Sequence, residues 1–205
     1  MLKISDFFLN IKTDNLLSIG SLEIEKGKMV NLIGNNRSGK SLLFKTIHGE
    51  YYNYTGEILL QEKPAIFYKR RKQTVLVEAT SHLLLDETVW RNIVLPFPKL
   101  SSRLKLKITE LCMFAGIDRQ LQQKAGMVSY SEQKFIEIIR AVAQLPSIVL
   151  IDDMDRFFDP VNLANALKIC DFVTNSGSSL IISSQNKIEN CDKVLKIQAG
   201  TVVEL

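Results

Sequence analysis

Eight residues near position 40 have the types and the spacing of a loop that binds phosphate. Residues 34–41 match the pattern GxxxxGK[ST] at every fixed position. Glycines let backbone N–H groups turn inward around a phosphate, and a helix that begins there adds the positive end of its dipole. The pattern therefore predicts a phosphate site. Its residues are Gly34, Asn35, Asn36, Arg37, Ser38, Gly39, Lys40 and Ser41.

The last two residues of this loop, Lys40 and Ser41, indicate that the bound phosphate belongs to a nucleotide with Mg²⁺. We expect Lys40 to reach the β- and γ-phosphates of a nucleotide, and Ser41 to offer its hydroxyl to Mg²⁺, which prefers hard oxygen ligands. A glycine-containing turn that binds nothing is the alternative. The context argues against it, because the loop lies between the apolar run 29–33 and a helical pattern that starts at Gly39.

Two carboxylates are the next candidates for chemistry. Asp152 and Asp153 directly follow the apolar run 148–151. Alone, this pattern fits a strand end as well as a metal site, but α/β sheets bind ligands beyond the carboxyl ends of their strands. Together with the phosphate loop, we expect Asp152 to hold Mg²⁺ through water. Asp153 is then placed to orient or deprotonate an attacking water.

A parallel sheet is expected to position these residues. Short apolar runs alternate with helical patterns, which indicates strands covered by helices on both faces. Residues 1–28 are typical of short strand segments, and residues 83–140 are mostly helical in pattern. The apolar runs lie at 29–33, 74–77, 148–151 and 179–183.

The composition of the chain predicts one globular domain and gives no support for nucleic-acid binding, a zinc site or a membrane span. A chain of 205 residues with 46% hydrophobic content predicts one compact domain, and a net charge of +4 is too small to argue for nucleic acid. Three cysteines without a CxxC pair fit reduced thiols and do not support zinc. No window approaches the ~20 apolar residues that would span a bilayer. We therefore expect no membrane span of its own and no nucleic-acid partner.

In the order of its motifs, the chain resembles the ATP-binding cassette (ABC) ATPases over essentially its whole length. Residues 26–34 resemble the run into that family's phosphate loop, and 81–96 resemble the start of its helical subdomain. Residues 131–142 resemble the helix that precedes Asp152. In detail, the sequence is most similar to the subgroup for lipoprotein release, macrolide export and cell division.

The resemblance implies a fold and a set of partners. The implied fold is an α/β P-loop NTPase, one ABC ATPase domain over residues 1–205. A RecA-like parallel-sheet core spans about 1–78 and 141–205, with an N-terminal antiparallel β portion and an inserted α-helical subdomain at about 79–140. The implied cofactors are ATP and Mg²⁺. The implied partners are a second ABC subunit, identical or different, and a transmembrane permease-type subunit, which places the chain in the cytoplasm on the inner face of the cell membrane.

The family's signature segment is altered in this chain. The pattern LSGGE appears at residues 128–132 as Val, Ser, Tyr, Ser and Glu, which keeps Ser129 and Glu132 but replaces both glycines. In the family, these glycines let the start of a helix approach the γ-phosphate bound by the opposing subunit. We expect Tyr130 and Ser131 to obstruct or loosen that contact.

Other family positions are altered too. The catalytic glutamate aligns with Asp153, which is one methylene shorter, and the switch histidine aligns with Gln185, which carries no positive charge. The glutamine that senses Mg²⁺ aligns with Ala79, beside Glu78. The aromatic residue that stacks on adenine aligns near Ile11.

These alterations predict an ATPase in which binding and dimer closure matter more than rapid turnover. The alternative is an ATP-binding structural or regulatory module with little or no hydrolysis. A GTPase is disfavoured because residues 186–189 carry Glu in place of the Asp of NKxD and no DxxG is present. The basic cluster 69–72 is interpreted as a solvated loop between strands.

Overall fold

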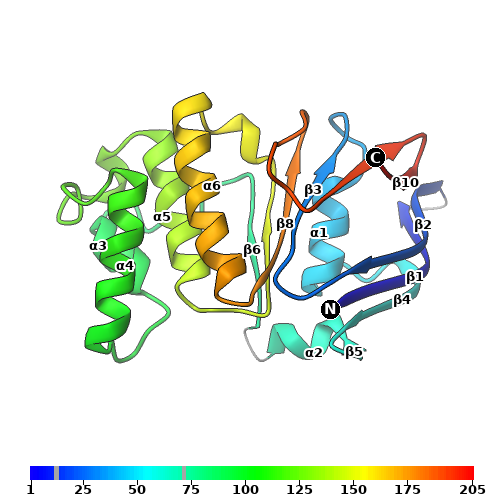
Figure 1. The fold of residues 1–205 in the computed structure, drawn as a ribbon, viewed down its shortest axis with the longest axis horizontal. Coiled ribbons are helices and arrows are strands. Elements are labelled where there is room, and N and C mark those ends of the chain that lie inside the picture. Colours follow the sequence, from blue (N-terminus) through cyan, green and yellow to red (C-terminus); the bar gives the residue numbers. More distant parts are fainter. Residues whose placement is uncertain (12–13, 71–72) are drawn as a thin grey trace.

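The computed structural model describes residues 1–11, 14–70 and 73–205, without the side chains of 11, 14, 15 and 68–70. Within these residues, ten strands form one sheet in the order β5-β4-β1-β2-β10-β9-β3-β8-β7-β6. Figure 1 shows the N-terminal strands at one end of the molecule and helices α3 to α5 at the other. The sheet therefore connects a β-rich end to a helical end.

The central strands are parallel and buried. Every residue of β3, β7 and β8 is buried, which explains why these strands are mostly apolar and do not alternate between apolar and exposed polar residues. The predicted parallel core is confirmed. The strands of this core pair in parallel in the order β9 (Lys193–Gln198), β3 (Met29–Ile33), β8 (Ser179–Ser184), β7 (Ile148–Ile151) and β6 (Thr74–Val77).

The N-terminal strands are antiparallel, as predicted, but longer than expected. Residues 1–28 form two long strands rather than short segments, because the alternation of apolar and polar residues continues along most of their length and one face of each strand is buried. The antiparallel strands are β1 (Leu2–Ile11), β2 (Asp14–Ile24), β4 (Tyr54–Leu60) and β5 (Lys63–Pro64). Strand β10 (Thr201–Glu204) pairs with β2 and β9 and joins the two parts of the sheet.

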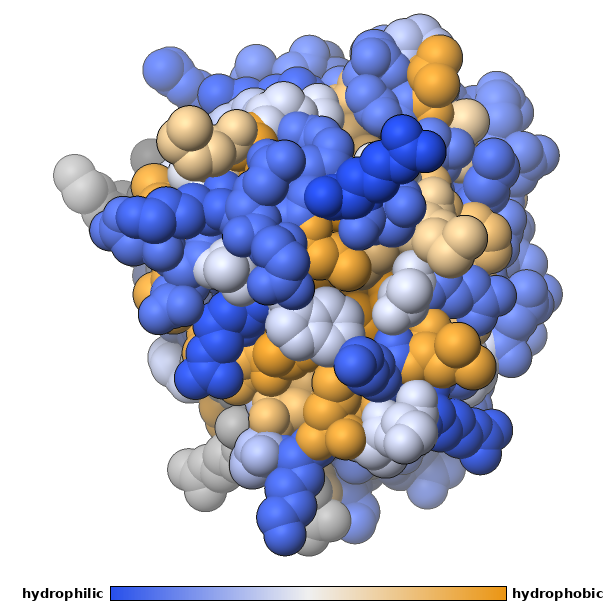
Figure 2. Space-filling model, turned by 90° about the vertical axis from the view of Figure 1, so that its left-hand side faces the viewer, coloured by the Kyte–Doolittle hydropathy of each residue, from blue (hydrophilic) through white to orange (hydrophobic). Residues whose placement is uncertain are grey.

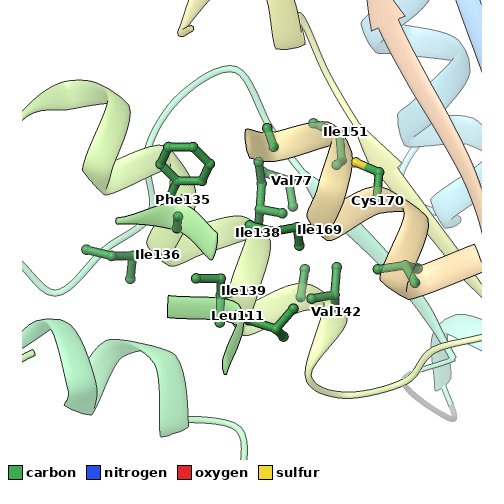
Figure 3. Packing of buried hydrophobic residues seen from close by; sticks show 14 of the residues in the cluster. Val77, Leu111, Phe135, Ile136, Ile138, Ile139, Val142, Ile151, Ile169 and Cys170 are labelled. Carbon is green, nitrogen blue, oxygen red and sulfur yellow. The ribbon is translucent and has the colours of Figure 1, made fainter. Parts of the chain in front are cut away.

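Helices cover both faces of the parallel strands. Successive side chains of β7 alternate between two hydrophobic clusters: Ile148 and Leu150 pack in the cluster beneath α1, and Val149 and Ile151 in the cluster beneath α5 and α6. Figure 3 shows the second cluster, where side chains from α5 and α6 meet those of the strands. The helices are α1 (Lys40–His48), α2 (Ala65–Arg70), α3 (Val89–Val94), α4 (Ser102–Ala115), α5 (Tyr130–Val142) and α6 (Pro160–Asn175), with 3-10 turns η1 (Ala125–Met127) and η2 (Met154–Arg156).

Residues 83–140 are mostly helical, as the sequence pattern predicted. Residues 83–88 and 116–124 contain no helix, and Gly116 ends α4 in a left-handed conformation. Figure 2 shows the helical end of the molecule, with apolar side chains gathered among hydrophilic ones. Leu106 and Met113 on α4 are both exposed.

The basic cluster at 69–72 was predicted to lie in a loop. That prediction is wrong for residues 69 and 70, whose backbone forms the end of α2. A short helix was missed because six residues give too few positions to show a helical period. The side chains of the cluster lie outside the described residues.

Gly56 makes the closest backbone approach in the antiparallel strands. It has φ 89, and a Cβ there would lie 2.2 Å from the carbonyl oxygen of Asp6, where the pairing of β1 with β4 shifts register. We expect Gly56→Ala to destabilise the fold by at least about 2 kcal/mol, from left-handed backbone strain and the clash. Denaturant unfolding measures this loss. Gly20→Ala is the control, because a Cβ at Gly20 meets nothing within 4 Å; equal effects of the two changes would contradict the prediction.

Candidate functional site

The phosphate loop joins β3 to α1 and forms one wall of a pocket. The loop turns through two left-handed residues, Arg37 with φ 65 and Gly39 with φ 101. The pocket has a volume of about 270 Å³ and opens between the loop and the end of β7. Its lining consists of Leu16, Asn36, Arg37, Ser38, Gly39, Lys40, Ser41, Leu42 and Asp153.

Lys40 places a buried positive charge in this pocket. Its side chain is only 5% exposed, and its Nζ donates to the carbonyl oxygens of Gly34 at 2.7 Å and Asn35 at 3.1 Å. The Oδ1 of Asp153 lies 3.9 Å away. Phosphate oxygens would compete well for such an ammonium group, since charge-assisted hydrogen bonds are stronger than those to neutral carbonyls.

The two carboxylates are positioned from β7 with the help of β8. Ser183 on β8 donates to Oδ1 of Asp152 at 2.5 Å, and its hydroxyl oxygen accepts the backbone N–H of Asp153 at 2.8 Å. Asp152 is also fixed by its N–H bond to Val77 of β6 at 2.9 Å. The two aspartates are therefore held by β7 and by the strands on both sides of it, β6 and β8.

Asp153 differs from Asp152 in its backbone and its environment. It has φ 50, a left-handed conformation that aspartate tolerates better than most residues. Partial burial raises the pKa of its carboxyl above the ordinary value, the adjacent Asp152 raises it further, and Lys40 opposes this. The ionised form of Asp153, which a water-activating role requires, is thus disfavoured by its surroundings.

The raised pKa predicts a dependence of stability on pH. The folded state binds the Asp153 proton more tightly than the unfolded chain, so stability is lost as pH rises above the unfolded pKa of about 3.9 and through the folded value. We therefore expect Asp153→Asn to be more stable than the parent chain at pH 7. Urea unfolding between pH 4 and pH 8 tests this. The advantage should shrink toward acid, and a less stable variant at pH 7 would contradict it.

Gln185 contacts the phosphate loop from the end of β8. Its Nε2 donates to Oδ1 of Asn36 at 3.1 Å. The backbone N–H groups of Gln185 and Asn186 both donate to Oδ2 of Asp155, at 2.9 and 3.1 Å. Asp155 therefore fixes the segment that carries Gln185, whose side chain contacts the phosphate loop but does not line the pocket.

The signature residues form a helix cap. Ser129 accepts the N–H of Glu132 at 3.3 Å, and Glu132 accepts the N–H of Ser129 at 2.7 Å, which is a complete capping box at the start of α5. Tyr130 is exposed beside Phe157, with ring centroids 5.5 Å apart. Ser129 and Glu132 do not line the described pocket, so the structure does not bring them together with Lys40 in one chain.

Two sequence expectations concern residues at the edge of the site. Ile11 ends β1, but its side chain lies outside the described residues. Leu16, on the neighbouring strand, lines the pocket, and no motif pointed to it. Glu78 has its carboxylate bound to Lys45 at 2.6 Å and near His82 at 3.4 Å, which engages it away from the phosphate loop.

The residues present fit ATP with Mg²⁺. A buried ammonium, a loop of backbone N–H groups and a helix N-terminus suit the phosphates. Among the described residues, no group of three or more His, Cys, Asp or Glu could hold a metal ion. Mg²⁺ bound to phosphates needs only one or two protein ligands, which Ser41 and Asp152 could supply, with waters completing its shell.

Comparison with known proteins agrees with the fold and the site. The model of the ABC transporter family matches residues 17–155, more than half of the chain. The chain is 25% identical to the methionine import ATP-binding protein MetN 1 of Acinetobacter baylyi over 89% of the chain and 55% of that protein. It is 26% identical to the tungstate uptake system ATP-binding protein TupC of Peptoclostridium acidaminophilum, over 92% of the chain and 90% of that protein.

Solved structures show the same fold. An ATP-binding subunit of an ABC transporter matches with a TM-score of 0.87 and 20% identity, over 100% of the chain and 89% of that structure. CbiO1 of Clostridium perfringens, described as part of the complex cbiONQ, matches with a TM-score of 0.81 and 21% identity, over 98% and 86%. The chain spans 55% to 62% of the methionine import proteins of A. baylyi and Clostridioides difficile. It belongs to the ABC transporter family, whose ATP-binding proteins it resembles in sequence and fold.

Proposed function

We propose that the chain is the ATP-binding subunit of an ABC-type membrane transport complex. It dimerises around ATP and Mg²⁺ and couples nucleotide binding and slow hydrolysis to a membrane partner. The observation that carries the proposal is the pocket where Lys40, Ser41 and Asp153 converge beside the phosphate loop. Membership of the ABC family supports ATP as the bound nucleotide, and the altered signature segment supports slow turnover.

The residues have distinct proposed roles. Residues 34–41 bind the phosphates, and Ser41 and Asp152 hold Mg²⁺. Asp153 orients or deprotonates water, and Gln185 senses the γ-phosphate. The cap residues Ser129 and Glu132 act on the nucleotide of the second subunit, and Ile11 contributes to the adenine side together with Leu16.

The membrane partner is proposed to be a permease-type subunit. In the described ranges 1–11, 14–70 and 73–205, no helix is both long and apolar enough to cross a bilayer. We propose a peripheral position on the inner face of the membrane, with the permease between a core of residues 1–78 and 141–205 and a helical subdomain of 79–140. Exposed apolar side chains at the helical end (Figure 2) are compatible with such a contact. The resemblance to the release, export and cell-division subgroup stays a prediction, because the relatives named above are import proteins.

Turnover of ATP by the purified chain tests the proposal. We expect ATP–Mg²⁺ binding with turnover well below about 1 s⁻¹, the lower end of typical enzyme rates. Asp153 is the carboxylate that lines the pocket beside the phosphate loop, so Asp153→Asn should leave binding intact and remove the residual activity. Phosphate release and calorimetric titration measure the two properties. Brisk hydrolysis that Asp153→Asn abolishes would refute slow turnover, and failure to bind ATP would refute the function.

A further inference from the structure

A pair of opposite charges is buried within the helical end. Lys134 and Glu137 lie one turn apart on α5, with side chains 2% and 4% exposed, and Nζ lies 2.7 Å from Oε2. Burying both charges costs several kcal/mol per ion, and apolar residues of similar size often stabilise a fold equally well. Stability alone therefore does not explain this pair, and its other contacts indicate what it does.

Both side chains bind the segment that follows β6. Glu137 accepts the backbone N–H of His82 at 2.6 Å and the hydroxyl of Ser81 at 3.3 Å. Lys134 donates to the carbonyl oxygen of Glu78 at 2.7 Å. Arg140 of the same helix also donates to the carbonyl oxygen of His82, at 3.3 Å. Segment 78–82 is thus attached to α5 by hydrogen bonds from three charged groups, two of which form the buried pair. Such hydrogen bonds fix the orientation of the segment and the residues it places against α5. Apolar packing does not, because it is non-directional.

Lys134 also contacts the segment that follows Asp152 and Asp153. Its Nζ lies 4.4 Å from the centroid of the Phe157 ring, in the range of a cation–π contact. Ser131, at the start of α5, donates to the carbonyl oxygen of Phe157 at 2.7 Å. The first turns of α5 are therefore attached on one side to the 78–82 segment and on another to the chain that follows Asp153.

We propose that Lys134 and Glu137 are positioning residues that hold the cap of α5 in a fixed place relative to the nucleotide pocket. Segment 78–82 begins directly after Val77, and Val77 pairs with Ile151, which precedes Asp152. A shift of this segment is then transmitted to the cap that carries Ser129. The inference rests on the proposed function, in which that cap acts on the nucleotide of a second subunit.

The test replaces both charges in the full-length chain. Lys134→Met with Glu137→Met leaves no unpaired charge of the pair. Arg140 loses Glu137, which lies 3.9 Å away, but it keeps its hydrogen bonds to the carbonyl oxygen of His82, so the variant is expected to fold. The control is Lys3→Met with Glu23→Met, which removes an exposed 3.0 Å ion pair between β1 and β2. For each chain we would measure amide hydrogen exchange, the Kd for ATP with Mg²⁺, and dimerisation with a non-hydrolysable ATP analogue.

The expected result separates binding from positioning. In the Lys134 and Glu137 double variant, exchange in 78–84 should be at least about 10-fold faster. ATP affinity should change by less than about 2-fold, and analogue-induced dimerisation should weaken by at least about 5-fold, the scale of coupling along a contact network. The control should match the parent chain in all three.

Unchanged exchange in 78–84, or unchanged dimerisation despite faster exchange, would overturn the inference. If the parent chain neither binds ATP nor dimerises, the proposed function fails. The exchange rates then still decide whether the pair fixes the segment. If the double variant does not fold, Lys134→Gln with Glu137→Gln replaces it, since glutamine offers a donor and an acceptor of similar size at both positions and leaves no buried charge of the pair unpaired. It should show the same changes with smaller amplitude, and parent-like exchange and dimerisation would again overturn the inference.

Discussion

Replacing Lys40 with methionine should raise the Kd for ATP–Mg²⁺ by at least about 100-fold. The Nζ of Lys40 is the buried cation of the pocket and is bound to two loop carbonyls. In the complex, it would bond to phosphate oxygens. Each hydrogen bond to a charged group contributes about 1.5–3 kcal/mol, and a 100-fold change corresponds to about 2.7 kcal/mol. Isothermal titration with ATP and Mg²⁺ measures the loss.

The matched control for this change is Lys45→Met. Lys45 lies on the same helix, but it pairs with Glu78 and does not line the pocket. Its replacement should alter the Kd by less than about 3-fold, because it removes no group placed to bind phosphate. Methionine has nearly the volume of lysine, so both variants should unfold cooperatively near the parent midpoint. An affinity of Lys40→Met within 10-fold of the parent value would refute the assigned role.

The phosphate loop and the strand ends could be predicted from the sequence because their signals are local. The loop combines a fixed spacing of glycines with a preceding apolar run and a following helical period. Asp152 and Asp153 follow the most uniform apolar run, which marks a strand buried on both faces. In both cases, a few consecutive residues determine the local structure.

Residues that reach the site through sheet pairing could not be predicted. Ser183 is brought to Asp152 because β8 pairs with β7, and Leu16 reaches the loop from β2. Asp155 accepts a hydrogen bond from the backbone N–H of Gln185, which lies 30 residues later in the sequence. Serine and leucine in strands carry no motif, and pairing register cannot be read from one strand. These contacts therefore required the tertiary structure.

The helical end shows a similar limit. Lys134 and Glu137 would be expected on a solvent-facing side of α5, because an (i, i+3) charge pair is typical of a helix surface. The structure buries both, because segment 78–82 covers them and supplies backbone partners. Most of the helix itself, by contrast, lies within residues 83–140, whose pattern predicted helices.

Replacing Phe135 with alanine should destabilise the chain by about 3–5 kcal/mol, the usual cost of removing a buried phenylalanine side chain. Phe135 is 1% exposed in the cluster beneath α5 (Figure 3), and its ring centroid lies 4.6 Å from that of Phe158. The change removes apolar burial and leaves a cavity between α5 and the segment that leads into α6. Urea unfolding followed by circular dichroism measures the loss.

Phe114→Ala is the matched control, because Phe114 is 39% exposed near the end of α4 and the chemical change is the same. We expect the free energy of unfolding to fall by less than about 1 kcal/mol there, because a substitution destabilises strongly mainly where it leaves a cavity or removes a buried contact. The cluster extends from the helical end to β7, so Phe135→Ala should lower the midpoint of one cooperative transition. A separate early transition of the helical end would instead show that this end unfolds independently. A loss for Phe135→Ala as small as the control would show that the α5 packing does not stabilise the chain.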